Sequence, residues 1–297
     1  KLNSTGNIMW QKSYGGSSAD YAESIKQTTD GGYIIAGFSE STDGDVTENY
    51  GYADYWIVKL NSTGNIMWQK SYGGSSIDRA NSIQQTSDGG FIVAGEGHSI
   101  DGDVTGHHGV QRYPDYWIVK LNSSGTILWQ KSYGGSSYEI VNSIQQTSDG
   151  GYIVAGGSDS YDGDVTGNHG IDDCWIVKLN STGNIMWQKS YGGSSRDEAF
   201  SIQQTSDGGY IVAGYSESTD GDVTGNYSEY DYWVVKLNST GNIMWQKCLG
   251  GSGTDWAFSI QKTADSGYIV AGRSHSTDGD VTGHHGDADF WVVKLSK

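Results

Sequence analysis

The sequence predicts an all-β fold, a five-bladed β-propeller, and three observations lead to this expectation. One block, KLNSTGNIMWQKSYGG, starts at Lys1 and returns in nearly the same form at Lys59, Lys120, Lys178 and Lys236. A sixth start, KLSK at Lys294, ends the chain at the phase of the repeat where the chain began. The composition is rich in Gly, Tyr and Trp, and almost no stretch has a helical apolar period. Internal repeats of roughly sixty residues are typical of a solenoid, a propeller or an array.

Each repeat is expected to contain four strands, and the second repeat serves as the type. Its first two strands, 82–86 and 91–95, flank Ser-Asp-Gly-Gly, and Asp-Gly between β-forming residues is a strong hairpin signal. A long loop leads to the third strand, 115–121, and the turn Asn-Ser-Ser-Gly leads to the fourth, 126–133. The apolar runs are nearly continuous, as in strands that are covered on both faces.

The five blades are predicted to form one domain, 1–297. Their approximate bounds are 19–74, 77–135, 138–193, 196–251, and 254–297 together with 1–16. The last repeat has strands at 259–263, 268–272 and 290–295 but lacks a fourth. We expect residues 7–14 to pair beside 290–295 and close the ring, because closure removes two exposed sheet edges.

The tryptophans indicate a shared interior. Ten of the 11 fall into two slots of the repeat, one in the WIVKL strand and one in the MWQK strand. We interpret them as packing residues between blades, with stacking of sugars as the alternative. Trp256 is the exception, because its slot holds Tyr21, Arg79, Ile140 and Glu198 in the other repeats. It is the Trp that we expect to touch a ligand or partner.

Charge and composition exclude some classes of partner. The formal net charge is −17 and the pI is about 4.5, whereas a nucleic-acid partner would require a basic surface. No apolar stretch is long enough to insert into a membrane, and no signal peptide is visible, although the start at Lys1 leaves a processed leader or flanking domains open. The two cysteines cannot form a disulfide framework.

Sequons for N-glycosylation occur in five turns and in one long loop. The asparagines are Asn3, Asn61, Asn122, Asn180, Asn238 and Asn226. The alternative is that Asn-Ser-Thr-Gly is simply good turn chemistry. With the acidic, Ser/Thr/Asn-rich surface, the sequons favour an extracellular or cell-surface protein.

The long loops contain a candidate calcium site. The sequence DGDVTG followed by an Asp resembles the EF-hand loop, in which alternating oxygen side chains surround Ca²⁺ and a Gly makes the sharp turn. The resemblance implies three ligand sets: Asp162, Asp164, Thr166 and Asp173; Asp220, Asp222, Thr224 and Asp231; Asp278, Asp280, Thr282 and Asp289. The match lacks flanking helices and ends on Asp instead of Glu. The alternative is a solvated turn in which Asp and Thr bond their own backbone.

Comparison of the five copies locates a variable surface. In antiparallel blades the SDGG and NSTG turns share one face, and the long loops share the opposite face with the GGSS connections. The slots that vary lie on the loop face, while the opposite turns barely change. The candidate ligand or partner residues are Tyr21, Arg79, Tyr138, Arg196, Trp256, Phe38, Glu96, Tyr215, Arg273, His98 and His275. Drift at exposed positions is the alternative, but one-sided variation favours a face adapted to a partner.

Catalysis is not expected. Some five-bladed propellers are glycoside hydrolases, but that chemistry requires two carboxyl groups in different roles. Here candidate carboxylates such as Asp20, Asp78 and Glu139 recur in every blade. No phosphate loop, nucleophile elbow or Cys-His pair is present.

The blocks SIQQTSDGGYIVAG and DYWIVKLNSTGNIMWQKSYGG resemble secreted propeller-repeat proteins of bacteria and archaea. That resemblance implies an exported or cell-surface location and no defined activity. In architecture the expected fold is also similar to the tachylectin family, five-bladed lectins with one sugar pocket per blade. Their binding motifs do not match these residues, so no site is carried over.

The sequence therefore predicts a non-catalytic extracellular propeller with one variable face for multivalent binding of a glycan or surface protein, stabilised by Ca²⁺. The alternative is a structural tile of a surface layer or filament, in which the same loops contact copies of the chain. A hydrolase-type enzyme is the third and least favoured hypothesis.

Overall fold

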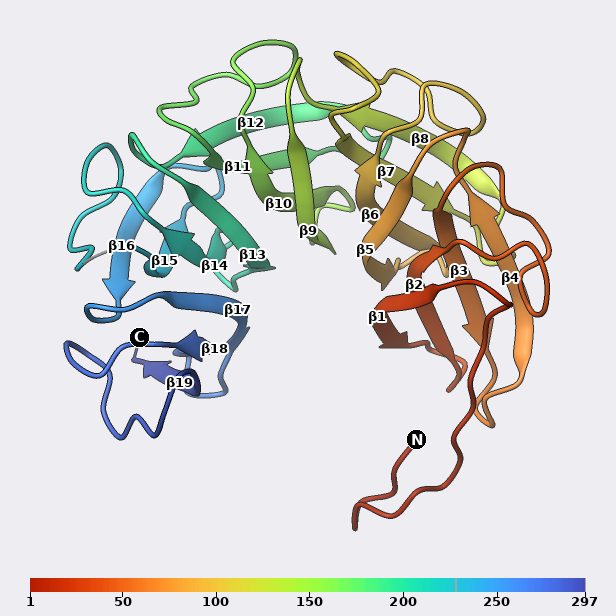
Figure 1. Ribbon diagram of the computed structural model, residues 1–297, viewed down its shortest axis with the longest axis horizontal. Helices are drawn as coiled ribbons and strands as arrows, with labels where there is room; N and C mark the ends of the chain where they lie inside the picture. The colour runs from red at the N-terminus through yellow and green to blue at the C-terminus, as the bar shows by residue number, and fades with distance from the viewer. Residues whose placement is uncertain (228, 297) are drawn as a thin grey trace. The chain divides into compact units, whose positions relative to one another are not determined.

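Every regular element in the computed structural model is a β-strand. The structure describes residues 1–227 and 229–296, and the strands form five antiparallel sheets in which consecutive strands are neighbours (Figure 1). The predicted all-β class with five repeated blades is confirmed. Among the described residues there is no helix with the length and apolar character that a membrane span requires. The chain divides into two compact units, Lys1–Tyr133 and Gly134–Lys297.

Unit 1 contains the first two blades, each with four strands. The strands are β1 (Asp20–Gln27), β2 (Tyr33–Ser39), β3 (Asp54–Leu60), β4 (Ile66–Tyr72), β5 (Asp78–Gln85), β6 (Phe91–Gly97), β7 (Asp115–Leu121) and β8 (Ile127–Tyr133).

Unit 2 contains two four-stranded blades and a blade with three strands. The strands are β9 (Glu139–Gln146), β10 (Tyr152–Ser158), β11 (Asp173–Leu179), β12 (Ile185–Tyr191), β13 (Asp197–Gln204), β14 (Tyr210–Ser216), β15 (Asp231–Leu237), β16 (Ile243–Leu249), β17 (Asp255–Lys262), β18 (Tyr268–Ser274) and β19 (Asp289–Leu295).

The first strand of each blade begins earlier than predicted. In β5 the pairing starts at Asp78, which lies opposite Gly97, whereas the sequence predicted a start at 82. A bulge between Ala80 and Ser82 shifts the register, so the side-chain alternation is broken inside the strand. The uninterrupted run of β-forming residues therefore lies after the bulge, and the prediction included only that part of the strand.

The third strands form the centre of the packing, as the tryptophan slots predicted. All seven residues of β7 are buried, and the same holds for β3, β11 and β15. The Trp117 ring lies 4.5 Å from the ring of Tyr55 in the preceding blade, whose hydroxyl donates to the Trp117 carbonyl. Adjacent blades in this unit are thus joined by buried aromatic side chains. Truncation of such a side chain to Ala typically destabilises the folded state by about 3–5 kcal/mol.

Within each unit, the other tryptophan slot packs a fourth strand against the following blade. Trp68 meets Phe91 at 5.9 Å, and in unit 2 Trp187 meets Tyr210 at 5.9 Å. In the N-terminal segment, Trp10 meets Tyr33 at the same 5.9 Å.

The N-terminal segment therefore occupies the position of a fourth strand against the first blade, although residues 7–14 are not assigned to a strand. The Tyr14 hydroxyl donates to the Gly64 carbonyl, as Tyr72 donates to Gly125. In unit 2, β19 is paired with β18 within the three-stranded sheet. Closure of the ring by residues 7–14, and with it the single domain, stays a prediction.

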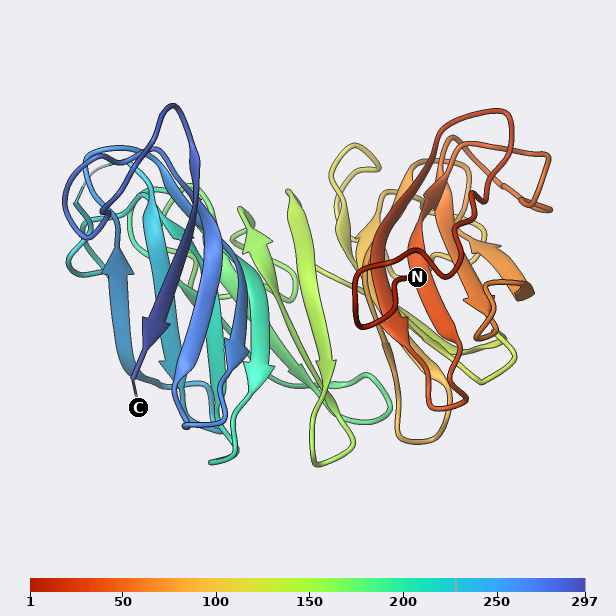
Figure 2. The ribbon, with the colours of Figure 1, turned by 90° about the horizontal axis from the view of Figure 1, so that it is seen from below.

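Each blade has two distinct ends, and its strands run between them (Figure 2). The turn end carries the SDGG and NSTG turns, and the loop end carries the long loops and the GGSS connections. At the loop end of unit 2, the Ser194 amide donates to Asp220 Oδ1 at 2.7 Å, which ties a connection to the long loop of the next blade. The predicted division of turns and loops between opposite ends is confirmed within the blades.

Candidate binding face

The variable positions form opposed pairs at the loop end, because two slots face each other across the first hairpin of every blade. One slot is the second residue of the first strand, and the other is the next-to-last residue of the second strand. The opposed pairs are Tyr21 with Phe38, Arg79 with Glu96, Ile140 with Gly157, Glu198 with Tyr215, and Trp256 with Arg273. We call these ten residues the variable belt.

Contacts between neighbouring blades link these pairs within each unit. In unit 1 the Arg79 guanidinium lies 4.9 Å from the centre of the Phe38 ring, and Phe38 stacks on Tyr21 at 4.5 Å. In unit 2 Tyr215 stacks on Trp256 at 5.0 Å, and the Arg273 guanidinium lies 4.1 Å from the Trp256 ring. Residues far apart in the sequence thus form one surface in each unit.

Unit 2 contains an aromatic cluster that the sequence analysis only partly identified. Phe200 packs against Phe258 at 5.2 Å and stacks on Trp256 at 6.4 Å, and Tyr230 meets Tyr215 at 5.2 Å. Phe200 and Phe258 share a slot that holds Glu23, Asn81 and Asn142 in the other repeats. That variation was a signal that could have found both.

Polar groups surround this cluster. Glu198 accepts hydrogen bonds from the Tyr215 hydroxyl at 3.0 Å and from Asn142 Nδ2 at 2.8 Å. Burial and the nearby Glu198 carboxylate raise the pKa of Tyr215 well above its usual range, so its hydroxyl stays protonated. The side-chain nitrogens Trp256 Nε1 and Arg273 Nε are buried without a hydrogen-bond partner.

The remaining predicted face residues also lie at the loop ends of the blades, but they are not members of the variable belt. Arg196 lies 3.6 Å from Asp172, and its pKa is raised by a hydrogen bond with Tyr230, so it borders the aromatic cluster. In unit 1 the His98 ring lies 3.7 Å from Glu96 of the variable belt.

Two further predicted residues lie elsewhere at the loop end of unit 2. The Tyr138 amide donates to Asp159 Oδ1, and the Tyr138 side chain is 37% exposed. The His275 ring lies 3.7 Å from Asp287.

The predicted calcium ligands of each long loop face different neighbours. Asp220 accepts from Ser194, Thr224 lies beside the Gln246 amide, and Asp231 Oδ2 accepts from the Tyr227 amide at 2.8 Å. Asp222 Oδ2 lies 3.4 Å from the Gly192 amide. Within residues 1–227 and 229–296, no group of three or more acidic, His or Cys side chains is arranged to hold a metal ion. Calcium in these loops stays a prediction.

The sequon turns are built around the asparagine oxygen. Asn61 Oδ1 accepts from the Thr63 amide, the Thr63 hydroxyl and the Asn65 amide at 3.0, 2.9 and 2.9 Å. The same bonds recur at Asn122, Asn180 and Asn238. The sixth sequon, at Asn226, includes Ser228, which lies outside the described residues. These bonds give the turn sequence a structural role, and glycosylation stays a prediction.

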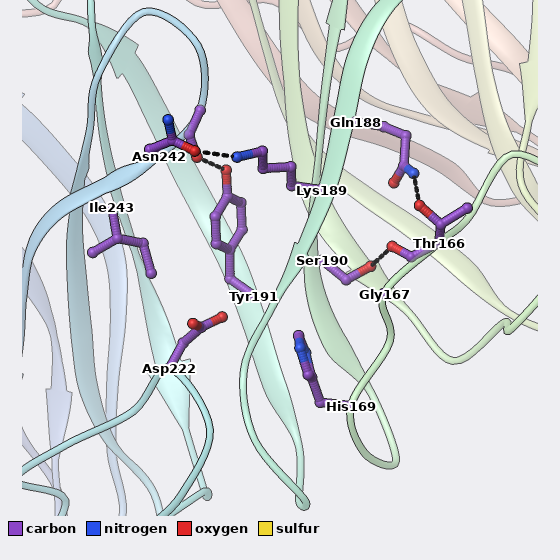
Figure 3. Close-up of a pocket in the computed structure, with 11 residues that line it drawn as sticks. Thr166, Gly167, His169, Gln188, Lys189, Ser190, Tyr191, Asp222, Asn242 and Ile243 are labelled. Atoms are coloured by element: carbon purple, nitrogen blue, oxygen red, sulfur yellow. Dashed lines mark hydrogen bonds between the residues drawn. The ribbon is translucent and has the colours of Figure 1, made fainter.

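A polar hollow of about 440 Å³ in unit 2 is lined by β12, by the long loops of the third and fourth blades and by the turn before β16 (Figure 3). Lys189 Nζ donates to Asn242 Oδ1, the Tyr191 hydroxyl donates to the Gly241 carbonyl, and Ser190 donates to the Thr166 carbonyl. His169 and Asp222 line another side. Most lining positions repeat in other blades, so this hollow belongs to the constant framework.

Comparisons with protein families and with curated proteins found no match. Among solved structures, the chain is similar to the Pan2 WD40 domain of Neurospora crassa, at 13% identity and a TM-score of 0.33, with 93% of this chain and 91% of that chain covered. It is also similar to BamB from Moraxella catarrhalis, at 14% identity and a TM-score of 0.28, with 84% and 82% covered. At these TM-scores the two similarities assign no function to this chain.

Proposed function

We propose that the chain is a non-catalytic binding module that engages another protein through the variable-belt residues of unit 2. The observation that carries this proposal is the aromatic and arginine cluster of unit 2, in which Tyr215, Trp256 and Arg273 stack at the loop end. Trp, Tyr and Arg are the residues that contribute most binding energy in protein interfaces. Phe258, at the edge of this cluster, is 43% exposed, so part of this apolar surface is accessible.

The composition of the belt favours one asymmetric partner. Within unit 2 its slots differ from blade to blade, with Ile140 and Gly157 in the third blade and Trp256 and Arg273 in the fifth. A glycan bound once per blade would need the same side chains in each copy. A protein surface, which is itself irregular, fits such a row better.

Retention of a partner by the immobilised chain tests this function. A protein retained from a cell-surface extract would be identified, purified and titrated against the chain. We expect Trp256→Ala and Arg273→Glu to weaken binding about tenfold or more, since central Trp and Arg residues typically contribute more than about 1–2 kcal/mol. Ser181→Ala at the turn end is the control with unchanged affinity. Equal affinity of all three variants and the wild type would contradict the proposal.

A repeated glycan site is the second candidate, and the hollow in Figure 3 favours it. Gln188 and Lys189 recur as Gln130 and Lys131 in the second blade, so similar hollows would give the multivalency that the sequence suggested. A glycan that binds wild type, is lost in Gln188→Ala and persists in Trp256→Ala would assign recognition to the hollow.

We also propose an extracellular or cell-surface location, with Ca²⁺ as a stabilising ion. The sequon turns and the acidic composition support this location. Detection of N-glycans at Asn61 or Asn122 by mass spectrometry of the native protein would test it. A structural tile remains the alternative, which self-association of the purified chain at its loop end would favour.

A further inference from the structure

The junction between β15 and β17 brings two buried carboxylates together. Asp231 begins β15 and Asp255 begins β17 of the next blade, and the Asp255 amide donates to the Tyr230 carbonyl at 2.6 Å. Both aspartates have an exposure of 0%. This backbone bond holds the starts of the two strands, and therefore the two side chains, close to each other.

Both carboxylates face the same point above Gly250. A Cβ atom at Gly250 would lie 2.4 Å from Asp231 Oδ1 and 2.5 Å from Asp255 Oδ2. Such distances are too short for carbon, and any other residue would clash with both carboxylates. The glycine therefore leaves the space in which the two side chains approach.

Hydrogen bonds leave part of this pair unsatisfied. Asp255 Oδ2 accepts from the Gly251 amide at 3.0 Å and the Ser276 hydroxyl at 2.7 Å, and Asp231 Oδ2 accepts from the Tyr227 amide. Asp231 Oδ1 and Asp255 Oδ1 are buried without a hydrogen-bond partner. Buried polar atoms without a partner are rare in native proteins, and an ion or a water molecule is one of the explanations for them.

The charges around Asp231 make this pair costly. Both side chains are fully buried, and burial disfavours the ionised form of each carboxyl group. Two buried like charges require a counter-charge or a proton.

An equivalent junction in the same unit also leaves Asp173 Oδ1 and Asp197 Oδ1 without a hydrogen-bond partner, but it contains a histidine. Asp173 and Asp197 flank Gly192 in the same way, but His169 Nδ1 lies 2.8 Å from Asp173 Oδ2. Tyr227 occupies the slot of this histidine at the Asp231 junction and offers only its amide there. The junction of Asp231 and Asp255 thus lacks the imidazole that its neighbour has.

We propose that a hard divalent cation of the Ca²⁺ class binds between Asp231 and Asp255. Carboxylate oxygens are the preferred ligands of such ions, and water completes the shell where the protein supplies only two carboxylates. This set differs from the single-loop arrangement that the sequence suggested, because Asp255 comes from the next blade. It is independent of the proposed partner binding at the belt.

Thermal unfolding of the full chain tests the site. At pH 7.5 we expect about 2 mM Ca²⁺ to raise the midpoint by about 4 °C or more over about 2 mM EDTA, because a ligand of the folded state stabilises it. Asp231→Asn should raise the midpoint in EDTA, since one like charge is removed, and should reduce the calcium shift. Asp149→Asn at the turn end is the matched control, since Asp149 is half exposed, bonded to Lys178 and outside every predicted ligand set, and its calcium shift should equal that of wild type.

Coinciding wild-type midpoints in Ca²⁺ and EDTA would overturn the proposal, as would an undiminished shift in Asp231→Asn. If the midpoint in EDTA instead rises between pH 7.5 and 5.5 without a calcium effect, the carboxylates share a proton and bind no cation. Should Asp231→Asn fail to fold, Tb³⁺ luminescence of the wild type, excited through Trp and Tyr, replaces it. Luminescence displaced by Ca²⁺ supports the site, and its absence overturns it.

Discussion

The two ends of strand β10 differ sharply, although each carries a glycine. At the turn end, a Cβ atom on Gly151 would lie 2.2 Å from the Leu179 carbonyl oxygen and 2.6 Å from Lys178 Nζ. At the loop end, a Cβ atom on Gly157 would lie 3.3 Å from the flexible Glu198 side chain and 3.9 Å from the Asp173 carbonyl oxygen. Gly151 recurs in every repeat, whereas the slot of Gly157 holds Phe38, Glu96, Tyr215 and Arg273 elsewhere.

This difference teaches that constancy among the repeats follows structural demand more closely than exposure. Asp149 is 50% exposed, yet its carboxylate lies 2.9 Å from the buried Lys178 amine, and the same pair recurs as Asp88 with Lys120. The turn end is therefore constant because its side chains complete the turns. The variation at the loop end alone is a weaker sign of binding than the sequence suggested, and the contacts between belt residues within each unit supply the stronger argument.

The largest difference in the free energy of unfolding is expected between Gly151→Ala and Gly157→Ala. The first places a methyl group against a fixed carbonyl and should destabilise the protein by about 1–3 kcal/mol or more. The second should change stability by less than about 0.5 kcal/mol. Chemical unfolding of both variants measures this, and equal losses would show that the two ends are packed alike.

The next effect concerns the buried lysine at the turn end. Lys178 Nζ donates to the Leu179 carbonyl at 3.0 Å and to Asp149 Oδ1 at 3.1 Å, and its side chain is 4% exposed. Lys178→Met should cost about 1–3 kcal/mol, because the carbonyl loses its partner. Lys294→Met is the matched control, since Lys294 makes the same bonds but is 41% exposed. A smaller loss in the control than in Lys178→Met is expected, and the reverse order would contradict this account.

At the loop end, Arg273→Gln should have a smaller effect on stability. It removes the guanidinium that lies 4.1 Å from the Trp256 ring, an interaction of about 0.5–1 kcal/mol. Unfolding measurements should therefore show a modest change, while partner affinity falls. A loss comparable to that of Lys178→Met would make Arg273 a structural residue.

The smallest effect on stability is expected from protonation of Asp149 in acid. Partial burial raises the pKa of Asp149, but hydrogen bonds from Thr147 and Lys178 outweigh it and hold the pKa at about 2. A folded pKa below the unfolded value near 3.9 means that this stabilisation is present above about pH 4 and is lost between about pH 4 and 2. Asp149 is half exposed, so the loss is small, and Asp149→Asn should remove this part of the acid sensitivity. An unchanged pH profile in that variant would contradict the assignment.

Much of the fold could be predicted because the same pattern of apolar runs and turn residues occurs in five copies. The strand 115–121 was predicted with the bounds of β7, since its apolar run is bounded by clear turns. The starts of β5 and its equivalents were missed, because a bulge interrupts the alternation and the residues before it are polar. The belt slots were found by comparing copies, but Phe200 and Phe258 were not, since their slot was not among those compared.

The sequence by itself determined the blades, their strand order and the division into a constant and a variable end, because turn chemistry and hydrophobic patterns act over short distances along the chain. The tertiary structure alone decided which side chains meet across blades. It stacked Tyr215 on Trp256, and it placed Asp231 opposite Asp255 over Gly250. Such contacts depend on the packing of one sheet against the next, which the spacing of residues within a repeat does not specify.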